Sequence, residues 1–90
     1  MPDKDTARGV VLAHAARILA VAPARLLAQP KLDTYPAFSS FRMVDLVEEL
    51  EQSLGITFDE ADLTLENLRH LDRLTAVTSR AADSAATRVA

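Results

Sequence analysis

The chain has 90 residues, 49% of them hydrophobic, and its formal net charge is −3. This length makes one small domain and leaves little room for a deep or two-lobed active site. The sequence contains no cysteine, which excludes disulfides and protein thiolate chemistry, and no apolar run approaches the length of a membrane span. Glycine is scarce and β-branched residues do not alternate with polar ones, so the composition favours an all-α fold.

The first predicted helix begins near Asp5 or Thr6, either of which can cap it, and runs to about Ala20. Its core-facing residues recur at helical spacing: Val11, Ala15, Ile18 and Leu19. A short helical turn is expected over residues 24–28, after Pro23 and before Pro30. The long connection over residues 29–39 contains three side chains spaced to pin it to the bundle: Leu32, Tyr35 and Phe38.

The clearest predicted helix covers residues 42–54. Its apolar stripe consists of Met43, Val47, Leu50 and Leu54, and is widened by Val44 and Leu46. The residues expected to point outward are Arg42, Asp45, Glu48, Glu49 and Gln52. Ser39 or Ser40 provides the N-cap, and Gly55 provides the left-handed residue that ends the helix.

After Gly55, we expect Ile56 and Phe58 to return to the core and residues 59–62 to form a polar turn. Leucines at positions 63, 65 and 68 predict a short third helix, and Leu71, Leu74 and Val77 predict a last helix over residues 71–80. The Ala-, Ser- and Thr-rich residues 81–90 either prolong that helix or fray, and we expect a flexible tail after a domain of residues 1–80. The whole is a small four-helix bundle with a long first loop.

Acidic residues are concentrated on and just after the 42–54 helix. Residues 41–70 contain eight acidic side chains and two basic ones, whereas the segments on either side have a slight basic excess. Such a face is a poor partner for nucleic acid and a good partner for a basic groove on another protein. The other interpretation is a solvated face that serves only solubility.

Catalysis and metal binding find little support in the sequence. The nucleophile pattern Gly-x-Ser-x-Gly is absent, and no Gly-rich stretch offers an oxyanion hole. His14 lies among apolar residues and His70 just precedes the last helix, so we expect no catalytic role for either. The acidic residues between positions 59 and 66 lack the central glycine and the ligand order of an EF-hand, so we expect no metal ion.

The remaining chemistry lies in the serine pair that opens the 42–54 helix. A hydroxyl at a helix start lies beside unpaired N–H groups and the positive end of the helix dipole, and both favour a phosphate. The stretch from Phe38 to Ile56 resembles the signature of acyl and peptidyl carrier proteins. In that resemblance, Ser40 falls on the family's modified serine, Asp45-Leu46 on its acidic–leucine pair and Leu50-Glu51 on its Leu-Glu pair.

Two flanking segments extend the resemblance to about residues 6–80. Leu19-Ala20-Val21 is similar to the Leu-Gly-Val that closes the family's first helix, and residues 62–74 are similar to the segment that enters its last helix. The resemblance implies a bundle of the acyl-carrier type with 4′-phosphopantetheine attached to Ser40. It also implies that the chain is not an enzyme, and that it holds an acyl or aminoacyl group as a thioester on the arm.

The implied partners are a phosphopantetheinyl transferase, a loading ligase for acyl or aminoacyl groups, and downstream synthases or transferases. The acidic docking residues implied by the resemblance are Asp45, Glu48 and Glu49. Phe41, Met43 and Val44 border that surface, and Arg42 makes it less uniformly acidic. We expect a discrete, monomeric carrier in the cytoplasm, because the first residues lack the order of a signal peptide.

Two residues depart from the family pattern. The residue before the modified serine is usually Asp, or His in peptidyl carriers, and the residue after it is usually Leu; here they are Ser39 and Phe41. Ser39 can still cap the helix, but it removes a negative charge beside the phosphate. The departures leave open whether the cargo is acyl or aminoacyl. They also keep an alternative open, a carrier-like helical interaction domain without a prosthetic group.

Overall fold

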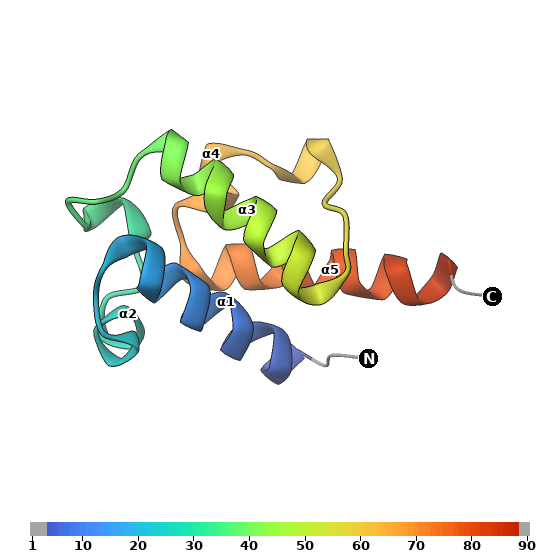
Figure 1. The fold of residues 1–90 in the computed structure, drawn as a ribbon, viewed down its shortest axis with the longest axis horizontal. Helices are drawn as coiled ribbons and strands as arrows, with labels where there is room; N and C mark the ends of the chain where they lie inside the picture. The colour runs from blue at the N-terminus through green and yellow to red at the C-terminus, as the bar shows by residue number, and fades with distance from the viewer. Residues whose placement is uncertain (1–3, 89–90) are drawn as a thin grey trace.

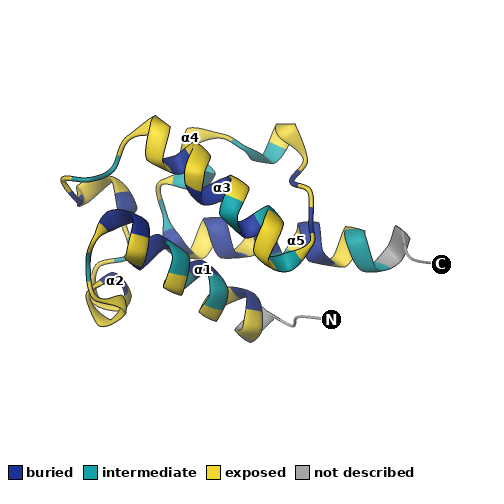
Figure 2. Cartoon of the chain, viewed as in Figure 1, coloured by how far each residue is buried: buried dark blue, intermediate teal, exposed yellow. Residues whose placement is uncertain are grey.

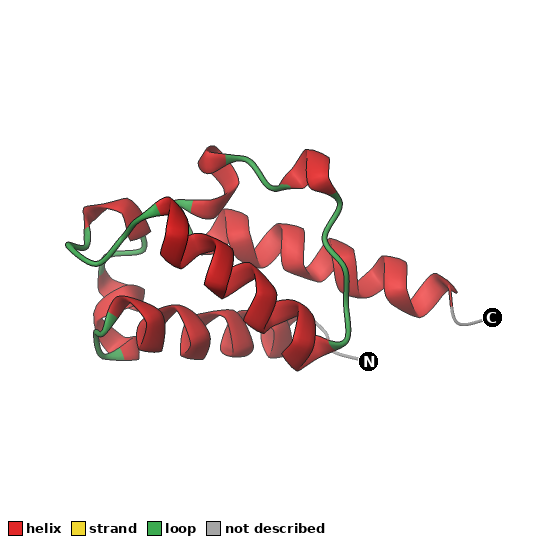
Figure 3. Cartoon of the chain, turned by 45° about the horizontal axis from the view of Figure 1, so that its top comes forward, coloured by secondary structure: helices red, strands yellow, loops and turns green. Residues whose placement is uncertain are grey.

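The computed structural model describes the backbone of residues 4–88 and the side chains of residues 6–86. These residues form five α-helices and two short 3-10 turns, shown in Figure 1: α1 (Lys4–Leu19), α2 (Pro23–Ala28), a turn at Leu32–Thr34, α3 (Ser40–Leu54), a turn at Glu60–Asp62, α4 (Leu65–Leu68) and α5 (Leu71–Arg88). Between residues 4 and 88 there is no strand, only an isolated bridge between Lys31 and His70. The all-α prediction is confirmed, as are the helical turn after Pro23 and the short helix before the last one (Figure 3).

The core lies where α1 packs against α3 and α5 (Figures 1 and 2). All four α1 residues predicted to face the core are buried: Val11, Ala15, Ile18 and Leu19. From α3 the buried side chains are Met43, Leu46, Val47 and Leu50, and from α5 they include Leu71, Leu74 and Val77. Burying one such Leu, Val or Met side chain stabilises the fold by about 1.5–3 kcal/mol.

One residue of the predicted α3 stripe lies outside the core. Val44 is 57% exposed, and Leu54 is only partly buried at the edge of the core. Val44 lies about 100° around the helix axis from Met43, to one side of the buried set. There it borders the hollow between α3 and the α4 segment, which leaves its side chain uncovered. The prediction that Val44 widens the core stripe is therefore wrong, and its side chain belongs to the surface.

The connection before α3 is held in place by buried side chains and backbone bonds. Leu32 and Tyr35 are buried as predicted, and Phe38 is partly buried. The Tyr35 hydroxyl lies 2.8 Å from the Gln29 carbonyl oxygen and 3.0 Å from that of Arg25. The Leu32 N–H donates to the Arg69 carbonyl at 2.7 Å, which ties the connection to the segment between α4 and α5. The start of α3 therefore follows a well-anchored segment.

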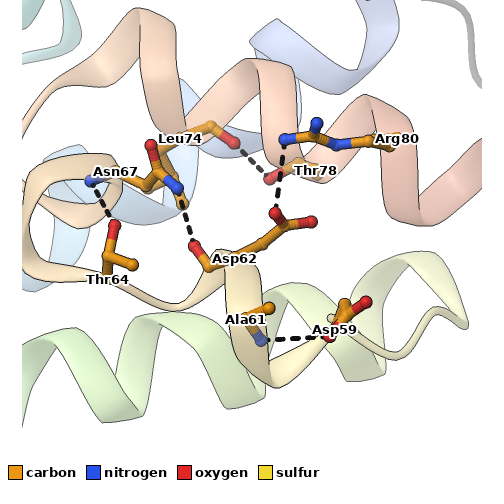
Figure 4. Close-up of polar contacts among 8 residues, drawn as sticks. All are labelled: Asp59, Ala61, Asp62, Thr64, Asn67, Leu74, Thr78 and Arg80. Carbon is orange, nitrogen blue, oxygen red and sulfur yellow. Dashed lines mark hydrogen bonds and ion pairs between the residues drawn. The ribbon is translucent and has the colours of Figure 1, made fainter.

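The segment between α3 and α5 is fastened by polar contacts (Figure 4). Asp59 caps its 3-10 turn by accepting from the Ala61 N–H at 3.0 Å, and Thr64 caps α4 by accepting from the Asn67 N–H at 3.2 Å. The Asn67 amide donates to the Asp62 carbonyl at 2.9 Å, and the Asp62 carboxylate lies 3.5 Å from the Arg80 guanidinium. These contacts join the acidic turn to α5 and account for its order.

The last helix is longer than predicted. It continues from Arg80 to Arg88, and Ala81 and Ala82 are buried against the rest of the core. Alanine has the highest helix propensity, and here its small side chain also packs. Of the two possibilities left open for residues 81–90, prolongation of the last helix is what residues 81–88 show; residues 89 and 90 lie outside the described part of the chain.

Candidate functional site

Ser40 is the first residue of α3 and is exposed to solvent. The residue before it, Ser39, has an extended backbone and is the N-cap: its Oγ accepts from the Arg42 N–H at 3.1 Å. The Met43 N–H donates to the Ser39 carbonyl at 3.0 Å and closes the first turn. Of the two serines that the sequence offered as caps, Ser39 is therefore the cap, and the exposed Ser40 is the first residue of the helix. The helix begins two residues before the predicted Arg42.

The electrostatics of this helix start favour a negative group. The N–H groups of Ser40 and Phe41 precede the first bond of the helical ladder and point out of its end. The first turn of α3 contains no acidic side chain, so nothing neutralises the positive end of the helix dipole. An anion placed there is stabilised by about 0.3–1 kcal/mol in an exposed setting.

The turn that ends α1 lies close to this site, because Arg42 bridges the two. Ala20 has a left-handed backbone with φ of 58°, and the Val21 N–H donates back to the Ala16 carbonyl at 3.0 Å. Arg42 Nη1 donates to the Ile18 carbonyl at 3.3 Å. The Arg42 side chain is thus directed to α1 although it is exposed, and its place among the docking residues stays a prediction.

Apolar side chains surround Ser40 on the solvent side. Phe41 is 82% exposed and Val44 57%, and together with Ser40 they line a shallow open hollow. A neighbouring hollow of about 320 Å³ lies between α3 and the α4 segment; its lining is Met43, Val44, Val47, Glu48, Glu51, Leu63 and Leu68. Met43 is only 1% exposed and belongs to the core. The structure therefore leaves Phe41 and Val44 as surface residues, and Met43 is buried, as its place in the predicted apolar stripe requires.

The three acidic residues predicted to dock partners are not equivalent. Asp45 and Glu48 are exposed, whereas the Glu49 side chain is 30% exposed and turned to α1. Glu49 Oε1 lies 3.0 Å from His14 Nδ1 and also pairs with the Arg17 guanidinium. Glu49 therefore has partners within the fold, and its role in docking stays a prediction.

His14 and His70 have structural partners. His14 is partly buried, and sequence reasoning missed its contact with Glu49 because the two residues are 35 positions apart on different helices. His70 Nδ1 accepts from the Asp72 N–H at 3.2 Å at the start of α5, which places it where it was predicted. Within the described part of the chain, no three His, Cys, Asp or Glu side chains come together as a metal site.

Comparison with protein-family models, with curated proteins and with solved structures gives no match for this chain. None of the helices between residues 4 and 88 combines the length and the apolar character that a membrane crossing requires. The case for a function therefore depends on the residues themselves and on the geometry around Ser40.

Proposed function

We propose that this chain is a carrier protein of the acyl or peptidyl type, modified on Ser40 by 4′-phosphopantetheine. The observation that supports this most is that two adjacent serines have different structural roles. The Ser39 Oγ caps the helix, and Ser40 is exposed at the positive end of α3. A phosphate ester on the Ser40 oxygen would lie beside the N–H groups of the first turn.

The residues present fit the proposed group. Ser40 is exposed and lines an open hollow with Phe41 and Val44, so among the described residues its oxygen is accessible to a long substituent. Modification forms a bond from Ser40 Oγ to the phosphorus next to pantetheine and breaks the pyrophosphate link of coenzyme A. The adenosine 3′,5′-bisphosphate half leaves, and the serine proton passes to the modifying enzyme. When bound, the arm supplies the terminal thiol that holds an acyl or aminoacyl group. The chain itself supplies the attachment point and the surface that partners recognise.

Two differences from the family pattern, Ser39 for Asp and Ala20 for Gly, have a local explanation. A family member with Asp before the serine would have a carboxylate as helix cap, and here the Ser39 hydroxyl performs that capping. A family member with Gly in the turn after the first helix has the residue that best tolerates a positive φ, and here Ala20 adopts it at φ 58°. The backbone geometry that those family residues favour is thus present with different side chains.

The proposed docking face consists of Phe41, Val44, Asp45 and Glu48. These positions follow the spacing i, i+3, i+4 and i+7, so they share one side of α3, and all four are exposed. Two apolar side chains beside two carboxylates suit a partner with an apolar patch flanked by basic residues. Such a contact is small, and a carrier must leave each enzyme that it visits. The hollow beneath Val44 offers apolar surface to part of an arm or its cargo.

The second candidate is a helical interaction domain that keeps this docking face without a prosthetic group. The absence of acid in the first turn, with Ser39 at the position of the usual Asp, is the observation that favours it. A transferase that requires that carboxylate for recognition would then not modify this chain.

Intact mass distinguishes the two candidates. The purified chain is incubated with coenzyme A, magnesium and a broad-specificity phosphopantetheinyl transferase, and with several others in parallel. The carrier proposal predicts the gain of one phosphopantetheinyl group, retained in Ser39→Ala and lost in Ser40→Ala. No gain with any transferase supports the interaction domain. A gain that survives Ser40→Ala and disappears in Ser39→Ala would show that the wrong serine was chosen.

A further inference from the structure

At the end of α1, Arg42 supplies a donor for the Ile18 carbonyl. A helix leaves its last four carbonyls without intrahelical partners. At the end of α1, the Val21 N–H donates to the Ala16 carbonyl at 3.0 Å and the Ala20 N–H to the Arg17 carbonyl at 3.2 Å. The next carbonyl, that of Ile18, accepts from Arg42 Nη1 at 3.3 Å. A cation at this point also complements the negative end of the helix dipole.

Arg42 is held at both of its ends. Its backbone N–H donates to the Ser39 Oγ at 3.1 Å, while its side chain reaches α1, 24 positions away in the sequence. On a helix, residues two positions apart point about 200° away from each other. The Arg42 side chain can therefore bind α1 while the Ser40 hydroxyl faces solvent on the opposite side of α3.

We infer that Arg42 is a positioning residue for Ser40, and that it clamps the first turn of α3 to the C-terminal end of α1. Ser40 lies between the cap residue and the clamped residue, so the clamp limits the movement of its backbone. A hydroxyl held in one place is already oriented for transfer when the modifying enzyme binds. Loss of this orientation should lower kcat and leave KM nearly unchanged. The significance for modification rests on the proposed function, whereas the clamp itself is a property of the fold.

A contact with partner enzymes is the competing role for Arg42. The docking face lies about 100° around the helix from Arg42, which shares the α1-facing side with Glu49 at i+7. Glu49 also contacts α1, through His14 and Arg17. Glu49 is therefore engaged with α1, and we place Arg42 with it, because the Arg42 side chain is exposed but donates to the same helix.

Two measurements on Arg42→Ala and Arg42→Lys test the inference. The first is amide hydrogen exchange by NMR on the unmodified chain. We expect protection of the amides at positions 42 and 43 to fall about tenfold in Arg42→Ala and to be largely restored in Arg42→Lys, with amides of α5 unchanged. The control Arg8→Ala removes the same charge and an exposed ion pair with Asp72, and should leave the α3 amides as they are. Unchanged protection in Arg42→Ala overturns the inference, whether or not Ser40 is ever modified.

The second measurement is the rate of Ser40 modification by the transferase. For a positioning residue we expect kcat to fall about tenfold in Arg42→Ala, KM to change less than twofold, and Arg42→Lys to recover most of the loss. A rise in KM at constant kcat identifies Arg42 as a partner contact and overturns the positioning role. Should the parent chain accept no group at all, the proposed function fails, and hydrogen exchange still decides whether the clamp exists.

Discussion

Helix α3 has two polar sides that look alike in the sequence and differ in what covers them. On one side Asp45 and Glu48 are exposed beside Phe41 and Val44. On the other side Arg42 and Glu49 reach across to α1. Glu48 and Glu49 are neighbours of the same type, and only the second has partners in α1. A charged residue on an amphipathic helix is thus available to a partner protein only where no other helix packs beside it.

The largest stability effect that separates the two sides is expected from charge reversal at Glu49. Glu49→Lys places a cation against Arg17 and His14, and the side chain is partly shielded from water. We expect a loss of about 2 kcal/mol in the free energy of unfolding, between the values typical of exposed and of buried pairs. Glu48→Lys, the matched control, should change it by less than about 0.5 kcal/mol. Urea unfolding followed by circular dichroism measures both, and equal losses would remove the distinction.

Charge reversal on the docking face should slow modification and leave the stability of the protein unchanged. The double variant Asp45→Lys with Glu48→Lys is expected to keep the stability of the parent and to lower kcat/KM for modification about tenfold, which corresponds to about 1.4 kcal/mol. The effect should shrink at high salt, because exposed charges are screened. Asp33→Lys with Glu60→Lys makes the same change of charge outside α3. If that control slows modification equally, net charge rather than this face is responsible.

The cap gives a smaller and local effect. Ser39→Ala removes the acceptor of the Arg42 N–H and should destabilise the protein by about 1 kcal/mol. Ser39→Asp keeps an acceptor at the same position and should retain most of the stability. Thermal unfolding of the two variants beside the parent checks this. An unchanged unfolding temperature in Ser39→Ala would mean that the hydroxyl is not the cap in solution.

The smallest expected change lies at the end of α1. Ala20 has a left-handed backbone, which disfavours a side chain, so Ala20→Gly should stabilise the protein by about 0.5 kcal/mol after the larger chain entropy of glycine is subtracted. Ala22 has φ of −68°, so Ala22→Gly is the matched control and should not stabilise. Chemical denaturation of both variants provides the comparison, and destabilisation by Ala20→Gly would contradict the turn described here.

Sequence reasoning succeeded where the physical cause is local. The serine cap and the left-handed Gly55 at the two ends of α3 were predictable because each depends on residues within one turn of the helix. The buried stripe of α3 was predictable from its helical period. The prediction was wrong at Val44, where the neighbouring α4 segment leaves the side chain uncovered. Local signals therefore located Ser40 at the start of its helix.

The errors concern contacts between distant segments. Glu49 meets α1 residues more than 30 positions away, and Arg42 meets a carbonyl 24 positions away; no short-range pattern reports which helix will lie beside them. The last helix ended too early in the prediction because its alanines carry no periodic signal of burial, although Ala81 and Ala82 pack into the core. Which of the charged residues on α3 are free for docking depends on that packing.

The most direct test of the account is the site of attachment on the chain. The protein is isolated from cells that contain phosphopantetheinyl transferases, digested, and sequenced by tandem mass spectrometry, with Ser40→Ala and Ser39→Ala prepared alongside. The account predicts one phosphopantetheinyl group on the Ser40 oxygen, present in Ser39→Ala and absent in Ser40→Ala. An unmodified Ser40 in cell-derived material, and again after treatment with active transferases and coenzyme A, would contradict it.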